Sequence, residues 1–279
     1  MASPIAETWI YATMLIENEW GGKGTGFLVL RAISNESGHI FLATNKHVLH
    51  ELPEKRQNAT KIILHFNVRN QDGSISGQTA ELPLIFEDGS KRWREHPDKD
   101  VDVLCFDITS LFIEYNQKIA HKGVDYSLFA DQTKIKEFDI TIGEEIVVIG
   151  YPLGFKQGTS NFPLVRSGII ATRIGETFED EYPEPDGTKR KRVIRGFLID
   201  GATIPGSSGS PVVLKPTIGR FVKGDIVMGF SPPLLLGIIA ETRYAPIPIS
   251  ERDYIPSFAG LGLAFDAETV KETIELFFK

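Results

Sequence analysis

The sequence contains a single cysteine, Cys105, among its 279 residues. One cysteine excludes an intrachain disulfide and suits a reducing compartment. Because Cys105 lies in an apolar, strand-like segment, we expect a small core residue and not a nucleophile. The sequence also lacks a cluster of His and Cys ligands and a His-Glu-x-x-His motif, so we expect the protein to need no metal and no cofactor.

Positive charge, a leader segment and a long apolar run are also missing. Thirty Lys and Arg residues against 37 Asp and Glu residues give a formal net charge of −7. This balance disfavours nucleic acid or an anionic membrane as the main partner. Residues 1–9 lack a basic start followed by an apolar core, and no apolar run reaches the roughly 18–20 residues of a membrane span. We therefore expect a cytoplasmic protein, whose oligomeric state the sequence does not indicate.

A glycine-rich segment at residues 21–26 lacks the pattern of a phosphate-binding loop. Such a loop needs a lysine followed by serine or threonine at the start of a helix. Here Lys23 is followed by Gly24 and then by a strand-like apolar run. We interpret these glycines as positions where strands cross closely.

Short strand-like runs separated by turn signals fill most of the sequence, which predicts a β-barrel or sandwich. The first strand is expected at residues 9–16, and a hairpin is expected to join residues 27–30 to residues 40–44. The charged segment at residues 176–195 predicts an exposed hairpin whose two arms carry opposite charge. A substrate-facing or regulatory loop is the alternative for this segment.

The sequence Gly-Ser-Ser-Gly-Ser-Pro at residues 206–211 follows one strand-like run and precedes another. Glycines allow a sharp bend and the close approach of a substrate. A tight turn can also aim successive backbone N–H groups at the oxyanion of an acyl-transfer intermediate. Because the same residue types dominate ordinary polar turns, the turn alone does not decide between these two interpretations.

Two upstream segments could supply a base and an acid for this turn. His47 lies in Thr-Asn-Lys-His-Val at residues 44–48, and Asp102 precedes the apolar run at residues 103–106. The flanking motif distinguishes His47 from the other histidines, which we interpret as structural or surface residues: His39, His50, His65, His96 and His121.

These segments, together with Gly-Thr-Gly at residues 24–26 and in this order along the chain, resemble the chymotrypsin-fold (trypsin-like) serine peptidases. They are most similar to the bacterial branch with the HtrA (Deg) proteases and the glutamyl endopeptidases, here without a PDZ domain. Framework segments at residues 142–154, 167–170 and 260–265 fit the same family, so the resemblance spans roughly residues 8 to 279.

The resemblance implies an all-β fold of two antiparallel six-stranded β-barrels, chymotrypsin-like, with a C-terminal α-helix. Its implied parts are an N-terminal barrel at residues 1–115, a crossover at residues 116–140, a second barrel at residues 141–265 and a helix at residues 266–279. We expect a helical turn near residues 116–122 in the crossover. Asp266 is expected to cap the last helix, which we expect to pack on the second barrel.

The resemblance also implies a serine endopeptidase that acts on polypeptides through an acyl-enzyme. Ser208 would attack the scissile carbonyl, His47 would transfer the proton, and Asp102 would orient the imidazole. The backbone N–H groups of Gly206 and Ser208 would form the oxyanion hole. Asp100 is a rival for the acid; the strand register favours Asp102 and leaves Asp100 as a solvated turn residue.

Two residues around Ser208 depart from the commoner family pattern. Trypsin-like enzymes usually have an aspartate before the serine, which pairs with a newly freed N-terminus, and this chain has Ser207. We therefore expect no activation by N-terminal cleavage. Ser210 replaces a second glycine, as it does in glutamyl endopeptidases.

The substrate pocket implied by the resemblance has Ala202, Thr203 and Ile204 at its base. No charge there would attract Lys or Arg, so we expect small or medium apolar P1 side chains. The alternative stays open that Thr242 or Arg243, on the opposite wall of the pocket, favours an acidic P1 side chain.

Two other functions stay open. One is a catalytically silent pseudoprotease that binds peptides or regulates a partner, against which the intact set of three residues argues. The other is an esterase, against which the strand following Ser208 argues, since the esterase elbow leads into a helix.

Overall fold

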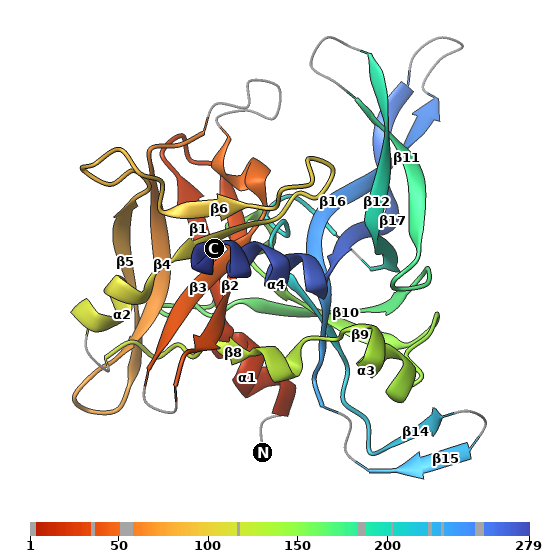
Figure 1. Cartoon of the computed structure of the whole chain (residues 1–279), viewed down its shortest axis with the longest axis horizontal. Helices are drawn as coiled ribbons and strands as arrows, with labels where there is room; N and C mark the ends of the chain where they lie inside the picture. The colour runs from red at the N-terminus through yellow and green to blue at the C-terminus, as the bar shows by residue number, and fades with distance from the viewer. Residues whose placement is uncertain are drawn as a thin grey trace.

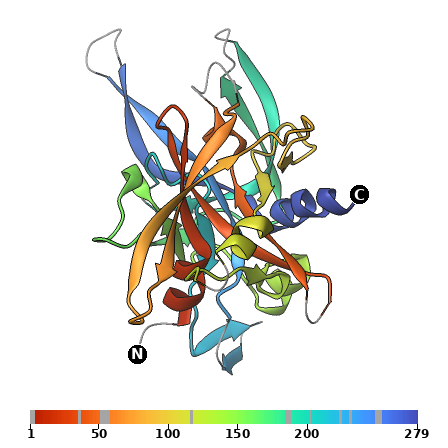
Figure 2. The ribbon, with the colours of Figure 1, turned by 90° about the vertical axis from the view of Figure 1, so that its left-hand side faces the viewer.

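The computed structural model describes residues 4–34, 37–50, 58–115, 118–183, 188–201, 203–222, 225–229, 232–248 and 254–279. Its strands form two main sheets, which lie on the left and right of the molecule, with the C-terminal helix between them (Figure 1). Seen from the side, two long hairpins of the second half of the chain, coloured teal and blue, extend toward the same end of the molecule (Figure 2).

The first sheet contains eight strands: β1 (Thr13–Asn18), β2 (Lys23–Ala32), β3 (Gly38–Thr44), β4 (Lys61–Arg69), β5 (Ile75–Pro83), β6 (Trp93–Glu95), β7 (Leu104–Asp107) and β8 (Val124–Asp125). Seven of them follow the antiparallel order β5-β4-β1-β2-β3-β7-β6, and the short β8 pairs with β2 in parallel. The expected hairpin is the β2–β3 pair, in which Phe27 lies opposite Ala43.

The second sheet contains seven strands: β9 (Glu145–Gly150), β10 (Leu164–Ile170), β11 (Thr177–Pro183), β12 (Lys189–Asp200), β13 (Pro211–Leu214), β16 (Leu235–Pro248) and β17 (Tyr254–Asp266). Their order is β10-β9-β13-β16-β17-β12-β11, and β10 also pairs with β12. This last pairing closes six of the strands into a ring, with β11 outside it.

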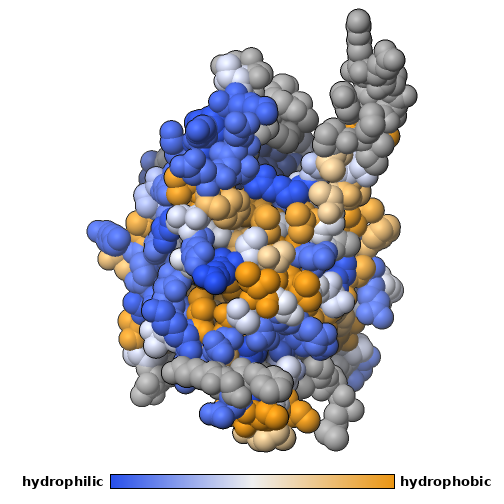
Figure 3. All heavy atoms as spheres, turned by 90° about the vertical axis from the view of Figure 1, so that its right-hand side faces the viewer, coloured by the Kyte–Doolittle hydropathy of each residue, from blue (hydrophilic) through white to orange (hydrophobic). Residues whose placement is uncertain are grey.

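A separate two-stranded hairpin, β14 (Gly219–Val222) with β15 (Asp225–Met228), extends from the second sheet. Ile226 and Met228 on β15 are exposed, and the apolar patch at the foot of the face in Figure 3 lies over this hairpin.

Within the described ranges four α-helices pack on the sheets: α1 (Pro4–Ala12), α2 (Thr109–Glu114), α3 (Gln132–Glu137) and α4 (Ala267–Glu275). Four single-turn 3₁₀ helices are also present: η1 (Lys46–Leu49), η2 (Tyr126–Leu128), η3 (Pro152–Gly154) and η4 (Leu276–Phe278).

Two local predictions in the first half of the chain were wrong. The strand expected at residues 9–16 is confirmed only from Thr13, where β1 begins. The chain is helical up to Ala12, because Trp9 and Ala12 reach the core from one side of α1. Trp9 donates its indole N–H to the carbonyl of Pro233, at 3.0 Å, which ties this helix to the second half of the chain. The helical turn expected near residues 116–122 is also misplaced, since the helix lies earlier, in α2, and the described residues 118–122 are not helical.

The C-terminal helix packs on both sheets and not on the second alone. Val270 and Ile274 share one buried cluster with Phe41 of the first sheet and Ile238 of the second. Asp266 holds the N-cap position of α4, but its side chain accepts no capping hydrogen bond, contrary to the expectation. The helix therefore joins the two sheets through apolar contacts.

The main features of the predicted fold are confirmed: the protein is mostly β, with two sheet systems and a C-terminal helix. Cys105 is a buried core residue on β7, as expected, and burial raises the pKa of its thiol. A thiol held neutral in this way is a poor nucleophile.

Candidate active site

His47, Asp102 and Ser208 meet where the two sheets face each other. His47 lies in η1 just after β3, Asp102 lies just before β7, and Ser208 lies between β12 and β13. The Nδ1 atom of His47 is 2.5 Å from Oδ2 of Asp102, and its Nε2 atom is 2.8 Å from Oγ of Ser208. These distances form one continuous hydrogen-bonded line from a carboxylate through an imidazole to a hydroxyl.

The charges in this line perturb each other. Burial favours the neutral imidazole, but the charge and hydrogen bond of Asp102, with a further contribution from Glu241, raise the pKa of His47 above its usual value. Burial opposes ionisation of Asp102 as well, yet the charge and hydrogen bonds of His47 hold the pKa of that carboxyl below its usual range. The pair therefore favours an ionised Asp102 beside an imidazole that is ready to accept a proton.

Asn45 and the η1 turn hold the carboxylate in place. The side chain of Asn45 donates to the backbone carbonyl of Asp102 at 2.6 Å, and the backbone N–H of His47 donates to Oδ1 of Asp102 at 3.3 Å. This explains why the Thr-Asn-Lys-His motif surrounds the histidine, since two of its residues bind the segment that carries the acid.

The turn before Ser208 leaves two backbone donors free. The N–H of Ser207 donates to the carbonyl of Ile204 at 3.0 Å, and Gly206 between them has φ of +89°. This is the pattern of a type II turn, which requires glycine at that position. Within the described part of the chain, the N–H groups of Gly206 and Ser208 donate to no acceptor. Two unused donors therefore flank the hydroxyl.

Thr25, in the Gly-Thr-Gly motif of β2, ties the first sheet to this turn. Its hydroxyl donates to the carbonyl of Gly206 at 2.9 Å and accepts from the N–H of Tyr151 at 3.0 Å. Its backbone N–H donates to the carbonyl of Ser208 at 2.8 Å. The motif was identified from the sequence, but the role of the hydroxyl was missed, because its partners lie far along the chain.

The predicted substrate pocket is described only in part, because Ala202 lies outside the described residues. Thr203 is buried and its hydroxyl donates weakly to the carbonyl of Leu261, at 3.4 Å. A Cβ added at Gly262 would lie only 2.4 Å from a methyl carbon of Thr203. Ile204 is half-buried and donates its N–H to Oγ of Ser207 at 3.3 Å. The side chain of Thr203 thus fills the space beside Gly262.

The charged segment at residues 176–195 is the β11–β12 hairpin, as expected, and its arms pair across the hairpin with opposite charge. The expectation for Asp100 was wrong, because its carboxylate is not solvated but forms an ion pair with Arg190 of this hairpin. Only about a seventh of the Asp100 side chain is exposed, 14%. No local pattern predicts this contact, since strands β7 to β11 lie between the two residues along the chain.

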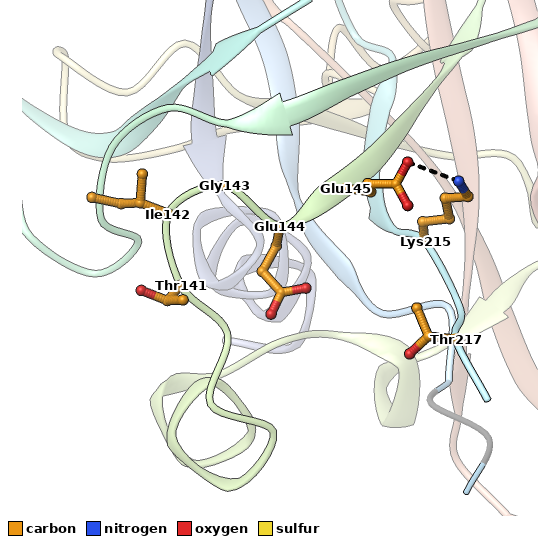
Figure 4. A pocket seen from close by; sticks show the side chains of 7 residues that line it. All are labelled: Thr141, Ile142, Gly143, Glu144, Glu145, Lys215 and Thr217. Carbon is orange, nitrogen blue, oxygen red and sulfur yellow. Dashed lines mark hydrogen bonds and ion pairs between the residues drawn. The ribbon is translucent and has the colours of Figure 1, made fainter. Parts of the chain in front are cut away.

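A hollow of about 360 Å³ lies at the start of β9 and contains no residue of the His47 site (Figure 4). Both of its acidic side chains are paired, Glu145 with Lys215 at 2.9 Å and Glu144 with Arg220 at 2.5 Å. Each carboxylate of this hollow thus has a cationic partner.

Within the ranges given above, no group of three or more His, Cys, Asp or Glu side chains is arranged to hold a metal ion. The helices in those ranges are all too short or too polar to cross a membrane.

Several solved protease structures are similar to this chain. Deg5 has a similar crystal structure, with a TM-score of 0.52 and 16% identity over 98% of this chain and 91% of Deg5. The active form of the Rv3671c protease from M. tuberculosis has a TM-score of 0.49 and 16% identity, over 97% of this chain and 82% of that chain. The HtrA-type protease AlgW with a tripeptide has a TM-score of 0.48 and 18% identity, over 98% of this chain and 62% of that chain.

No curated protein sequence is significantly similar to this chain. Residues 24–222 match the family described as "Trypsin-like peptidase domain", a span of more than half of the chain that contains His47, Asp102 and Ser208. The chain therefore belongs to the trypsin-like peptidase family and is a serine-type peptidase.

Proposed function

We propose that the chain is a serine endopeptidase in which Ser208 is the nucleophile, His47 the general base and acid, and Asp102 the residue that orients the imidazole. The observation that carries the proposal is the unbroken line of hydrogen bonds, 2.5 Å from Asp102 to His47 and 2.8 Å from His47 to Ser208. A serine hydroxyl needs a base within this reach to attack a carbonyl at neutral pH.

In the proposed reaction His47 accepts the Ser208 proton as Oγ bonds to the scissile carbonyl carbon. The resulting imidazolium is stabilised by Asp102 and then protonates the leaving amine, which breaks the C–N bond and leaves an acyl-enzyme. Water, deprotonated by His47, then attacks the acyl carbon. The C–Oγ bond breaks as His47 returns the proton to Oγ of Ser208, which frees the product carboxylic acid. The free N–H groups of Gly206 and Ser208 would bind the oxyanion in both steps.

Thr203 and Gly262 support a shallow primary pocket. The Thr203 side chain occupies the space that glycine leaves at residue 262, and no charged side chain is among the predicted base residues Thr203 and Ile204. We infer a preference for small or medium apolar P1 side chains. A peptide-library cleavage profile tests this, and strict cleavage after Lys or Arg would refute it.

Labelling with a fluorophosphonate probe, read by intact mass, tests the nucleophile. Wild type should gain one adduct and Ser208→Ala none. Ser210→Ala is the matched control, because Ser210 lies two residues away but is fully buried, and it should still be labelled. Equal labelling of wild type and Ser208→Ala would remove Ser208 from the mechanism.

Peptide hydrolysis distinguishes the endopeptidase from the alternative, a catalytically silent pseudoprotease that binds peptides. Ser208→Ala should lower kcat by roughly a million-fold, the scale of loss known for the nucleophile of subtilisin. A wild type that takes the probe and cleaves no peptide of a broad library would favour the peptide-binding alternative.

A further inference from the structure

Four charged side chains form a cluster between the β11–β12 hairpin and strand β16. Arg192, whose side chain is only 4% exposed, donates from Nη1 to Oε1 of Glu241 at 2.6 Å and from Nη2 to Oε2 at 2.7 Å. The same Nη2 lies 2.8 Å from Oδ2 of Asp180. Arg243 completes the cluster, 2.6 Å from Asp180 and 3.6 Å from Glu241.

Burial and geometry distinguish this cluster from the surface ion pairs of the hairpin. Taking a guanidinium and two carboxylates out of water is costly, and only close, multiple hydrogen bonds offset the cost. The planar fork of arginine can hold both oxygens of one carboxylate at once, which the single ammonium of lysine cannot do. The Arg192–Glu241 contact therefore fixes the orientation of Glu241 and not merely its distance.

Glu241 is attached directly to the reaction centre through the backbone. The carbonyl of the preceding residue, Ala240, lies 3.4 Å from Oγ of Ser208. One residue earlier, the carbonyl of Ile239 accepts from the N–H of Gly209 at 2.8 Å. The β16–β17 register shifts between Ile239 and Glu241, so the strand ladder is irregular at this point. At such an irregularity one residue is left unpaired in the ladder, so fewer backbone hydrogen bonds hold the strand there.

The charge of Glu241 also reaches His47. The charged groups around the imidazole are Asp102, before β7, and Glu241, on β16, and both stabilise its protonated form. Lys46, the neighbour of His47 in η1, instead donates to the carbonyls of His96 and Asp98, at 3.0 and 3.3 Å. Arg192 forms the closer, two-bond contact with Glu241, and Arg243 lies 3.6 Å from the same carboxylate. Loss of Arg192 should therefore leave more of that negative charge acting on the imidazole.

We propose that Arg192 is a positioning residue of the peptidase site: it holds Glu241, and with it the β16 backbone beside Ser208, and it neutralises that carboxylate next to His47. This inference rests on the proposed function of His47 and Ser208. It assigns part of the charged hairpin a role in the reaction, since the β11–β12 arm supplies the arginine and β16 supplies the backbone that contacts the nucleophile.

Three variants test the two parts of the proposal, with the titration of the His47 imidazole by NMR and the pH profile of kcat/KM as readouts. Glu241→Gln removes a negative charge, so the protonated imidazole loses stabilisation and the acid limb should move to lower pH. Arg192→Met removes the closest cation from Glu241, so the negative charge of Glu241 should act more strongly on the imidazole and the limb should move to higher pH. Arg192→Lys keeps the charge and loses the fork, so the limb should stay in place while kcat/KM on the plateau falls about tenfold.

An exposed ion pair on the same hairpin provides matched control variants. Lys189 and Glu181 form an ion pair whose side chains are 71% and 56% exposed. Lys189→Met and Glu181→Gln change the charge as the test variants do, and both should leave the NMR titration and the profile unchanged. If Arg192→Met does not fold, the other two variants still decide the matter.

Opposite results would overturn the inference without touching the proposed function. If the acid limb of the kcat/KM profile does not move in Glu241→Gln, then Glu241 does not act on the charge of His47. If the plateau value of kcat/KM in Arg192→Lys equals that of wild type, then Arg192 does not position the β16 backbone. Failure of the proposed function has a different signature. The wild type would then not react with a fluorophosphonate at Ser208, while the NMR titration of His47 could still be measured.

Discussion

The Nη2 atom of Arg166 donates a hydrogen bond to Oγ of Ser207 at 2.7 Å. Ser207 is buried and immediately precedes the proposed nucleophile, and its Oγ also accepts from the N–H of Ile204. Strand β10 is thereby bonded to the turn that carries the two free N–H groups. In this chain the bond stands at the position where relatives with an aspartate receive a freed N-terminus.

Loss of this bond should lower the rate more than the stability. Arg166→Met removes the donor, so the turn loses one of its anchors, and we expect kcat to fall about tenfold to a hundredfold with little change in KM. Steady-state kinetics on a cleaved peptide provide the measurement. Ser207→Ala should give at least this loss, because it also removes the contact with the N–H of Ile204. The double variant should lose no more than Ser207→Ala, because the Arg166 contact is already absent there.

Arg173→Met is the control for a lost arginine. Arg173 is 70% exposed and pairs with Glu176 three residues away, so its removal should leave kcat unchanged. Fully additive losses in Arg166→Met and Ser207→Ala would mean that the two side chains act separately.

The hydroxyl of Thr25 should matter to the rate as well as to stability. Thr25→Val keeps the branched shape and removes the contacts to Gly206 and Tyr151, which leaves two buried groups without a partner and costs about 1–3 kcal/mol. Because the Gly206 carbonyl is released, we also expect kcat/KM to fall at least tenfold. Denaturant unfolding and peptide kinetics measure the two effects.

Thr13→Val separates these effects. Thr13 is fully buried and its hydroxyl donates to the carbonyl of Trp9 at 2.7 Å, away from the turn. It should lose stability comparably and keep its kcat/KM. A Thr25→Val variant with normal kinetics would limit Thr25 to a structural role.

Sequence reasoning succeeded where a motif encodes a local backbone requirement. Gly206 and Gly209 have φ of +89° and +85°. Backbone angles of this kind favour glycine, so the two glycines in the sequence predict the turn. The Asn45–His47 motif likewise contains the residues that bind the acid-bearing segment. A family resemblance then brings the three distant segments together, as in the structure.

It failed where the outcome depends on partners far along the chain. The apolar run around Trp9 suits a helix as well as a strand over so short a length, and the contact with Pro233 is formed only on the helix. The ion pair of Asp100 with Arg190 joins residues whose proximity no local pattern predicts. Pairings of this kind follow from the completed fold and not from spacing.

Gly209 should tolerate no side chain, for a steric reason beyond its backbone angle. A Cβ at this position would lie 1.8 Å from the carbonyl oxygen of Thr25, whereas a Cβ at Gly21, with a similar φ of +81°, would meet nothing within 4 Å. We expect Gly21→Ala to cost about 1 kcal/mol through backbone strain alone. Gly209→Ala should cost about 3 kcal/mol or more and abolish fluorophosphonate labelling. Equal unfolding free energies for the two variants would contradict the close contact.

Asp266 should make the stability of the protein fall between mildly acidic and neutral pH. Burial, with the charge of nearby Glu268, raises the pKa of its carboxyl to about 7, although Arg195 opposes the rise. Its Oδ1 atom is buried and finds no partner among the described residues. In the unfolded chain this carboxyl has the ordinary aspartate pKa of 3.8, so the folded state binds more protons between these two pKa values. Stability from this group is therefore lost as pH rises through about 7.

Asp266→Asn keeps the shape and removes the charge, so it should unfold at a higher temperature than wild type at pH 8 and lose that advantage toward pH 4. Asp72→Asn is the contrasting control. Asp72 is an exposed turn residue whose pKa is held low by hydrogen bonds from Ser74, so its replacement should slightly lower the unfolding temperature at pH 8. The measurement is the thermal unfolding temperature between pH 4 and pH 8. If the difference in unfolding temperature between Asp266→Asn and wild type does not vary with pH, then Asp266 stays charged in the folded protein.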